Sequence, residues 1–237
     1  MSSRQLAVFD FDETLIGACC MRQILKFLPD YRRPPAYDFA KKGWIEYANS
    51  VFKELLSMGY SLETLCKFIC SLPPIPGMPQ LIEHLWNSSV PQYDLIIVSD
   101  CFSIFVTNWL KAHKLFKCFT GIYCNPTTIN DSGELIVDSY HCASCPFSPP
   151  NFCKNRVLNE FLSMQQQLNI NYDRVVYIGN GRNDFCPTLN MRSRDLVCAR
   201  KDDVLAEKIQ KNRKRMKIQP KLYLWVDGYE LLDNLAL

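Results

Sequence analysis

The sequence predicts an α/β fold, in which a doubly wound and mostly parallel β-sheet carries a small helical cap inserted after the first strand. Two observations lead to this prediction. Short apolar runs recur along the chain without polar alternation, which is typical of parallel strands covered on both faces. Longer stretches with helical periodicity follow most of these runs, and this alternation is the pattern of an open α/β sheet.

The apolar runs locate the expected strands. In chain order, they are residues 6–9, 95–98, 175–178, 196–198 and 222–226. Helical periodicity follows in residues 157–168 and 204–209. Each of the first three runs ends at a polar or glycine-containing segment, so the carboxyl ends of these strands are the natural place to look for a site.

The interval between the first two strands is too long for a single crossover. Residues from about 19 to 72 are mostly helical in pattern, with proline breaks at Pro34-Pro35 and Pro73-Pro74. We therefore expect residues 17–74 to form a helical cap insert, while residues 1–16 and 75–237 together form the core domain.

The composition is that of an ordinary globular protein. The chain has 237 residues, of which 48% are hydrophobic, and its formal net charge is +3. No run approaches the roughly 20 apolar residues that cross a bilayer, and residues 1–4 lead into a strand without a signal-peptide pattern. We expect a cytoplasmic protein with no membrane partner, whose twelve cysteines are reduced.

Residues 208–217 are basic enough to suggest nucleic acid or a nuclear signal. The alternative is a solvated helix end whose charges favour the helix dipole. Because the overall charge is nearly neutral and no aromatic residues interrupt the segment, we favour the alternative and expect no nucleic-acid partner.

Chemically useful side chains follow three of the expected strands. Asp10 and Asp12 follow the first strand, Ser99 follows the second, and Asp184 lies in the turn after the third. Lys154 opens the helix before the third strand. Each residue alone is as easily a cap, a turn former or a surface residue. Their joint occurrence at the ends of elements favours one shared crevice.

This set of residues suits phosphoryl transfer, which needs positioning and charge neutralisation. Asp10 can offer one oxygen to Mg²⁺ and attack phosphorus with the other. Asp12 projects to the same side of an extended segment and can act as general acid and then general base. Ser99 can donate a hydrogen bond to phosphate, Lys154 can neutralise its charge, and Asp184 can complete the metal shell.

Several segments resemble known motifs. Residues 8–15 (VFDFDETL), residues 97–100 (IVSD), Lys154 and residues 179–184 (GNGRND) are similar to the four motifs of haloacid dehalogenase (HAD) phosphatases. More narrowly, the chain resembles the phosphoethanolamine/phosphocholine phosphatase and pyridoxal phosphate phosphatase family. The residues that carry this resemblance are 71–78, Asn125-Pro126, 151–154 and 183–187.

The resemblance implies a Rossmann-like HAD core with a helical cap, and a small-molecule phosphomonoester as substrate. It implies that Asp10 is the nucleophile that becomes an aspartyl-phosphate and that Asp12 is the acid/base. It also implies that Thr14, Ser99 and Lys154 bind phosphate. The implied Mg²⁺ ligands come from the first and fourth motifs, and they are Asp10, Asp12, Asn180 and Asp184.

The chain departs from the family pattern at two places that bear on activity. Asn180 stands where relatives have a metal-ligand aspartate, so Mg²⁺ should be held more weakly. Residues 17–21 (GACCM) replace an acidic tract that is expected to recognise a cationic head group. Asp100 remains a candidate for substrate contact, although Phe102 stands where relatives usually have asparagine.

We therefore expect a Mg²⁺-dependent phosphomonoester hydrolase whose substrate belongs to the pyridoxal phosphate, phosphocholine or phosphoethanolamine class. One alternative is a weakly active or inactive phosphate-binding or regulatory homologue, because of Asn180. Another alternative is a pyrophosphatase that uses the same core residues.

A second, weaker metal hypothesis concerns the loop before Lys154. His141, Cys142, Cys145 and Cys153 could bind zinc, since Cys142 and Cys145 have the C-x-x-C spacing. Reduced cysteines in a loop are the favoured alternative, because the second C-x-x-C pair of a structural zinc site is absent. Trp44, in the expected cap, is a candidate for packing or for contact with a substrate ring.

Overall fold

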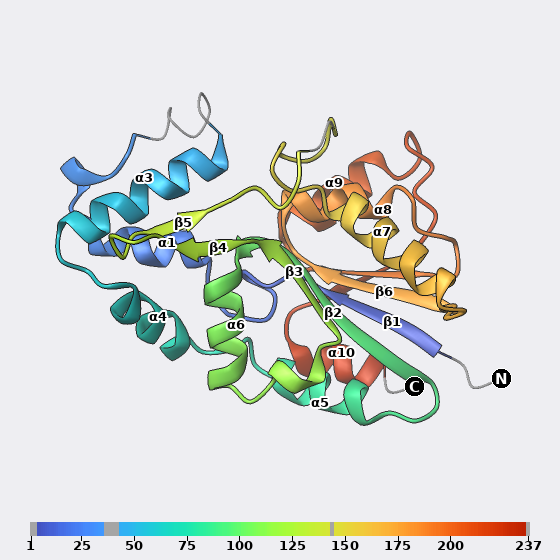
Figure 1. Ribbon diagram of the computed structural model, residues 1–237. Coiled ribbons are helices and arrows are strands. Elements are labelled where there is room, and N and C mark those ends of the chain that lie inside the picture. Colours follow the sequence, from blue (N-terminus) through green and yellow to red (C-terminus); the bar gives the residue numbers. More distant parts are fainter. Residues whose placement is uncertain (1–3, 36–42, 143–144, 236–237) are drawn as a thin grey trace.

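A six-stranded sheet forms the centre of the molecule in the computed structural model, which describes residues 4–35, 43–142 and 145–235 (Figure 1). Residues 1–3, where the sequence shows no signal-peptide pattern, lie outside the described residues. The strand order is β3-β2-β1-β6-β7-β8, and every adjacent pair is parallel. The strands are β1 (Arg4–Phe9), β2 (Gln92–Phe102), β3 (Gly121–Asn125), β6 (Arg174–Gly179), β7 (Leu196–Arg200) and β8 (Lys221–Trp225).

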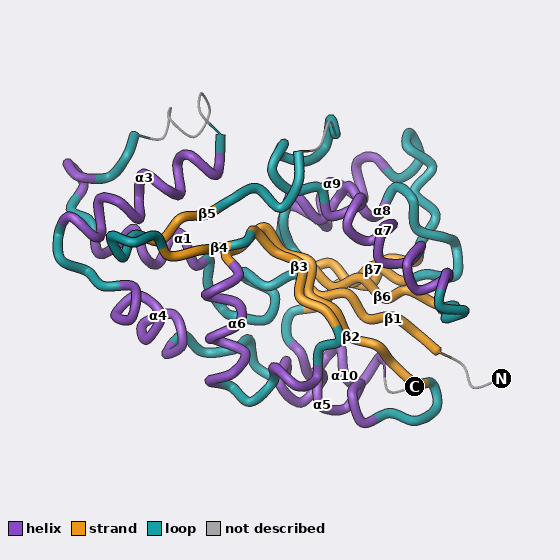
Figure 2. The backbone as a smooth tube through the Cα atoms, viewed as in Figure 1, coloured by secondary structure: helices purple, strands orange, loops and turns teal. Residues whose placement is uncertain are grey.

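Helices cover both faces of this sheet (Figures 1 and 2). Within β1, Leu6 and Val8 belong to one buried cluster while Ala7 and Phe9 belong to the other, because successive side chains point to opposite faces. One face packs against α7 (Lys154–Gln167), α8 (Phe185–Thr188) and α9 (Val204–Asn212). The opposite face packs against α5 (Met78–Asn87), α6 (Ser103–Ala112) and α10 (Gly228–Leu235).

The chain order creates a switch point beside β1. From β1 the chain proceeds outward through β2 to β3, and it later returns to β6 on the other side of β1. Ligands in open α/β sheets bind at such a point, outside the carboxyl ends of the strands. The backbone N–H of Asp10 donates to the carbonyl of Ile178 at 2.9 Å, so the end of β1 is fixed against the end of β6.

The region between β1 and β2 is helical, as the sequence predicts. It contains α1 (Cys20–Ile24), α3 (Trp44–Ser57) and α4 (Leu62–Ser71), together with the 3-10 helices η1 (Leu25–Phe27) and η2 (Asp30–Arg32). Two further 3-10 helices lie in the rest of the chain, η3 (Phe116–Cys118) and η4 (Arg182–Asp184). The boundaries of the cap at residues 17 and 74 remain a prediction.

A short hairpin, which the sequence reading missed, packs against this helical region. It consists of β4 (Thr127–Ile129) and β5 (Leu135–Val137), paired antiparallel. The side chain of Asn49 in α3 donates to the carbonyl of Val137 at 2.9 Å and accepts from its N–H at 2.8 Å. These two bonds give β5 a partner in α3, which joins the hairpin to the helical insert.

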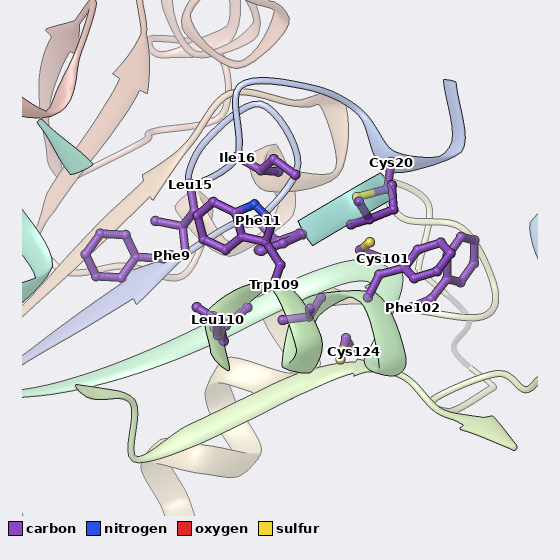
Figure 3. Close-up of a cluster of buried hydrophobic side chains, with 14 of the residues drawn as sticks. Phe9, Phe11, Leu15, Ile16, Cys20, Cys101, Phe102, Trp109, Leu110 and Cys124 are labelled. Carbon is purple, nitrogen blue, oxygen red and sulfur yellow. The ribbon is translucent and has the colours of Figure 1, made fainter. Parts of the chain in front are cut away.

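The loop after β1 is anchored by buried side chains (Figure 3). Phe11, Leu15 and Ile16 are fully buried, and the ring of Phe11 meets the edge of Trp109 with centroids 5.4 Å apart. The indole N–H of Trp109 also donates to the carbonyl of Leu72 at 2.9 Å, at the end of α4. The segment that carries Asp10 and Asp12 is therefore held between the sheet and α6.

The five expected strands correspond to β1, β2, β6, β7 and β8, and the predicted α/β class with a mostly parallel sheet is confirmed. Strand β3 escaped prediction because it is short and ends in polar Asn125. Within the described residues, no helix is both long and apolar enough to cross a bilayer.

Candidate active site

Lys154 lies at the centre of the candidate site. It is the first residue of α7, it has no exposed surface, and its ammonium Nζ is 2.7 Å from Oδ1 of both Asp10 and Asp184. Burial lowers the pKa of Lys154, but the charges of Asp10, Asp184 and Asp100 outweigh it and raise the pKa overall. The lysine is therefore a fixed positive charge that links the loop after β1 to the loop after β6.

Asp184 is surrounded by donors. Its Oδ1 accepts from Lys154 and from the hydroxyl of Tyr177, both at 2.7 Å, and its Oδ2 accepts from the N–H groups of Asn180 and Gly181 at 3.0 and 2.8 Å. Four donors fill the acceptor positions of a carboxylate. Asp184 is a buried brace that positions Lys154 and the turn, and its predicted role as a Mg²⁺ ligand stays a prediction.

A glycine makes this brace possible. A Cβ added at Gly179 would lie 2.6 Å from Cγ of Asp184, which is closer than real Cβ contacts allow. The glycine that ends β6 therefore leaves room for the Asp184 carboxylate to lie against the strand.

Asp10 presents one bound and one available oxygen. Oδ1 contacts Lys154 and accepts from the N–H of Phe11 at 2.7 Å. The residue is 4% exposed and lines the pocket at the end of β1. Burial raises the pKa of Asp10 well above its usual value, the charge of Asp184 raises it further, and Lys154 opposes both. Among these three effects, the pairing with Lys154 is the one that favours the ionised form that a nucleophile needs.

Asp12 lies on the same side of the pocket. Its Oδ2 accepts from the N–H of Cys20 at 3.2 Å, whereas its Oδ1 is buried and has no hydrogen-bond partner among the described residues. Burial raises the pKa of Asp12 to about 6, although the hydrogen bonds from Cys20 lower it. A carboxyl group with a pKa near neutrality can both give and take a proton at physiological pH.

Asn180 and Thr14 form a pair beside these carboxylates. The hydroxyl of Thr14 donates to Oδ1 of Asn180 at 3.4 Å, and Nδ2 of Asn180 donates to Oδ2 of Asp203 at 3.3 Å. Because a carboxylate can accept only from the amide nitrogen, Asp203 orients the side chain of Asn180. Thr14 was predicted to bind phosphate, but in this structure its hydroxyl contacts Asn180.

Ser99 and Asp100 lie in the last part of β2, where the pairing with β3 shifts register. Ser99 is fully buried, and its hydroxyl accepts from the N–H of Cys101 at 3.3 Å. The carbonyl of Asp100 accepts from Nδ2 of Asn125 at 2.6 Å, and Asn125 in turn accepts from Asn151 at 3.2 Å. This chain of amides holds the end of β2 against the loop before Lys154.

The pocket above these residues is small, at about 250 Å³. The residues that line it are Asp10, Asp12, Glu13, Cys19, Trp44, Asp100, Pro149, Asn180, Gly181 and Asn183. A neighbouring pocket shares Asp100, Pro149 and Asn183 with it. The ring of Trp44 stacks on Phe102 with centroids 5.9 Å apart and an angle of 10°, so one wall of the pocket is aromatic.

Of the predicted residues, Asp10, Asp12, Asp100 and Asn180 line a single pocket. The other four, Thr14, Ser99, Lys154 and Asp184, are buried and do not line it. Two residues of this arrangement were missed. Tyr177 was assigned only to a strand, and its sequence gives no sign that its hydroxyl reaches Asp184. Asp203 precedes α9, where an aspartate usually indicates a helix cap. In the loop before Lys154, Cys142 is exposed, and Nε2 of His141 accepts from the N–H of Cys153 at 2.9 Å.

Solved structures share this fold across the whole chain. A phosphoserine phosphohydrolase-like protein from Francisella tularensis covers 100% of both chains with a TM-score of 0.56 at 16% identity. A haloacid dehalogenase-like hydrolase from Streptococcus pneumoniae covers 99% of this chain and 98% of its own, with a TM-score of 0.54 at 16% identity. These two likenesses show the fold that this chain shares with both proteins.

Residues 5–237 match the family model described as "Putative Phosphatase", and the chain belongs to this family of HAD phosphatases. The pyridoxal phosphate phosphatase of Mus musculus is 35% identical over 233 residues, which cover 97% of this chain and 96% of the relative. The phosphoethanolamine/phosphocholine phosphatase of Homo sapiens is 29% identical over 213 residues, which cover 89% of this chain and 79% of the relative.

The environment of Asp12 predicts a pH-dependent stability difference in metal-free protein. The folded-state pKa of about 6 lies above the usual 3.8, so the folded state binds this proton more tightly than the unfolded state does. The stabilisation that the folded state gains from binding this proton more tightly is fully present below about pH 3.8, and it is lost as the pH rises through 6. Asp12→Asn should therefore gain on the order of 2 kcal/mol relative to the wild type between pH 4 and 7.5.

Urea unfolding at a series of pH values in EDTA measures this difference. Asp131→Asn, in an exposed turn, is the matched control and should follow the wild type. A gap between Asp12→Asn and the wild type that stays constant with pH would contradict the assigned environment.

Proposed function

We propose that this phosphatase is a Mg²⁺-dependent phosphomonoester hydrolase that acts through an aspartyl-phosphate on Asp10. The observation that carries the proposal is the ion pair between Asp10 and the buried Lys154 at 2.7 Å. An ammonium group has three donors, and Asp10 and Asp184 use two of them. The third donor and the positive charge can hold a phosphate oxygen beside the nucleophile.

The residues present suit a bound Mg²⁺ ion. Asp10, Asp12 and Asp100 line the pocket, and Asp184 lies behind it, so the site contains four carboxylates and one lysine. The buried Oδ1 of Asp12 has no donor, which is costly unless a cation compensates its charge. Asp10, Asp12 and Asn180 would hold the ion, with Asp184 positioning the turn behind them. When bound, Mg²⁺ would neutralise charge on the transferring phosphoryl group.

In the first step, the free oxygen of Asp10 attacks phosphorus. A bond forms between this oxygen and phosphorus while the bond from phosphorus to the leaving oxygen breaks. Asp12 donates its proton to the leaving alcohol, which departs neutral. Lys154 stays charged and faces the negative phosphoryl oxygens throughout.

In the second step, water replaces the departed alcohol. Asp12, now a carboxylate, takes a proton from this water as it attacks phosphorus, and the bond between phosphorus and the Asp10 oxygen breaks. Inorganic phosphate leaves and both aspartates regain their initial states. Asp12 thus recovers in this step the proton that it gave in the first, so one carboxyl group serves both proton transfers.

We further propose that the preferred substrate is a ring-bearing monoester of the pyridoxal phosphate kind. Trp44 lines the pocket and stacks on both Phe102 and Tyr47, so the wall that a substrate ring would meet is aromatic. Glu13 also lines the pocket, but its carboxylate is paired with Arg22. Because Arg22 already compensates this negative charge, Glu13 has less to offer a cationic head group. The relatives named as pyridoxal phosphate phosphatases are also more similar than those named as phosphoethanolamine/phosphocholine phosphatases.

A cytoplasmic location is also part of the proposal. All twelve cysteines are free thiols, and most of them are buried. Unpaired thiols are expected in a reducing compartment.

The proposed function predicts turnover against a panel of phosphate compounds with excess Mg²⁺. The panel contains pyridoxal phosphate, phosphocholine, phosphoethanolamine, pyrophosphate and p-nitrophenyl phosphate. Pyridoxal phosphate should give the highest kcat/KM, and EDTA should abolish phosphate release. Asp10→Asn should lower kcat by roughly a thousandfold or more, because an amide oxygen is a poor nucleophile.

Trp44→Ala tests the preference for a ring. It should lower kcat/KM for pyridoxal phosphate by up to about tenfold, and it should change kcat/KM for phosphoethanolamine much less. An equal loss of kcat/KM for both compounds would contradict the proposed preference for a ring-bearing substrate. Phosphate release by Asp10→Asn at the wild-type rate would refute the nucleophile assignment.

Because Asn180 is uncharged, we expect Mg²⁺ to bind weakly. Exchanging the side chains at positions 180 and 203 should strengthen binding without changing the total charge. The double variant Asn180→Asp/Asp203→Asn moves a carboxylate toward Asp10 and Asp12 and avoids repulsion across the 3.3 Å contact between the two side chains. It should lower the Mg²⁺ concentration for half-maximal activity by about tenfold, since a charged oxygen replaces a neutral one.

Asp203→Asn alone is the matched control. It replaces a carboxylate that can only accept by an amide that can also donate, so the side chain of Asn180 is no longer held in one orientation and the Mg²⁺ requirement should rise. An unchanged Mg²⁺ requirement in both variants would place Asn180 outside the metal site. A large gain in kcat for the exchange variant would mean that the native chain is an impaired enzyme, as the alternative of a regulatory homologue requires.

A further inference from the structure

Three cysteine sulfur atoms meet on the α7 side of the sheet, beside residues that line the pocket next to the candidate active site. Cys153 immediately precedes α7, Cys186 lies in α8, and Cys145 comes from the loop before them. The Sγ of Cys186 is 3.3 Å from that of Cys145 and 3.9 Å from that of Cys153, and all three lie within 4.8 Å of one another. Cys153 and Cys186 are buried, and Cys145 is half-buried.

These separations fit a tetrahedral metal site. A zinc ion with Zn–S bonds of about 2.3 Å sets its sulfur ligands about 3.8 Å apart along the edges of a tetrahedron. The two separations of 3.3 and 3.9 Å lie close to this value, and neither is the length of a covalent S–S bond. A disulfide would use only two of the three sulfur atoms.

Ser148 offers a fourth position. The N–H of Ser148 donates to the carbonyl of Cys145 at 3.3 Å, so residues 145–148 form a tight turn that brings the two side chains together. The hydroxyl of Ser148 interacts with the sulfur atoms of both Cys145 and Cys186. Its oxygen is buried and makes no hydrogen bond of normal geometry within the described residues.

We propose that Cys145, Cys153 and Cys186 bind a structural zinc ion, and that Ser148 occupies the fourth coordination position as a weaker ligand. Three thiolates supply soft ligands of the kind that select zinc over Mg²⁺. The set differs from the one that the sequence suggested. Cys145 and Cys153 remain, Cys186 joins them from a distant segment, and neither Cys142 nor His141 takes part.

The zinc ion would tie together two segments of the candidate active site. Cys153 is bonded to Lys154, and Cys186 lies two residues after Asp184. A zinc ion held by both cysteines would fix the start of α7 relative to the turn after β6, and so preserve the contact of 2.7 Å between Lys154 and Asp184. This positioning role rests on the proposed function, whereas the zinc site itself does not.

Metal analysis of the purified full-length protein tests the proposal. The wild type, prepared with zinc in the medium and then washed with a weak chelator, should contain about one zinc ion per chain. Replacement by Co²⁺ should give a thiolate-to-cobalt charge-transfer band. Cys20 and Cys101 lie beside Asp12 and could also bind Co²⁺, so the band should persist in Cys20→Ser. Asp10→Asn should retain the band while losing turnover.

Substitutions in the sulfur cluster sharpen the test. Ser148→Cys supplies a fourth thiolate and should tighten zinc binding by at least about tenfold. Cys186→Ser should lose zinc. Cys142→Ala is the matched control, because Cys142 is exposed and outside the cluster, and it should leave the zinc content unchanged.

Ser148→Cys keeps the test decisive if Cys186→Ser fails to fold. Wild-type protein without zinc and without the cobalt band would overturn the proposal, as would a zinc affinity that Ser148→Cys leaves unchanged. A disulfide between Cys145 and Cys186 in thiol-trapped protein would overturn it in favour of a redox pair. Failure of the phosphatase activity would leave the metal content unaffected, so the two proposals can fail separately.

Discussion

The buried ammonium of Lys154 is the constraint on which the rest of the site depends. A charge with no exposed surface is costly unless carboxylates and hydrogen bonds compensate it, and Asp10 and Asp184 do so at 2.7 Å each. These partners come from the ends of β1 and β6, which are neighbours in the sheet. The contact between Asp10 and Lys154 therefore requires the parallel sheet, the position of α7 and the tight turn after β6 to be formed together.

The same constraint separates the roles of the acidic residues. The carboxylate of Asp184 accepts from four donors of the protein itself. In contrast, Asp10 has an oxygen available, and Asp12 has a buried oxygen without a donor. A site that contains more carboxylates than cations favours a divalent ion and a substrate whose charge the ion can share. Asn180 and Asp203 change the charge of the site. The side chain that lines the pocket at position 180 is a neutral amide, and the carboxylate of Asp203 lies behind it.

The sequence predicted the central strands and the residues at their ends, because continuous apolar runs and the order of polar residues are local signals. It could not predict the hairpin of β4 and β5, because β5 is bound by Asn49 in a helix 88 residues earlier. It also missed that Asp184 braces Lys154, because the two residues are 30 positions apart and only the fold brings them together. Cys186 was recognised as part of a motif, but its contact with Cys145 joins segments 41 residues apart.

The most direct test of the account is to trap the phosphorylated enzyme. Protein mixed with labelled pyridoxal phosphate and Mg²⁺ is quenched in acid, reduced with borohydride and digested, because reduction converts an aspartyl-phosphate to homoserine. The account predicts that homoserine replaces Asp10 in the peptide, and that Asp12 in the same peptide is unchanged. Phosphate release during turnover with no modification at Asp10, or with modification at another residue, would contradict it.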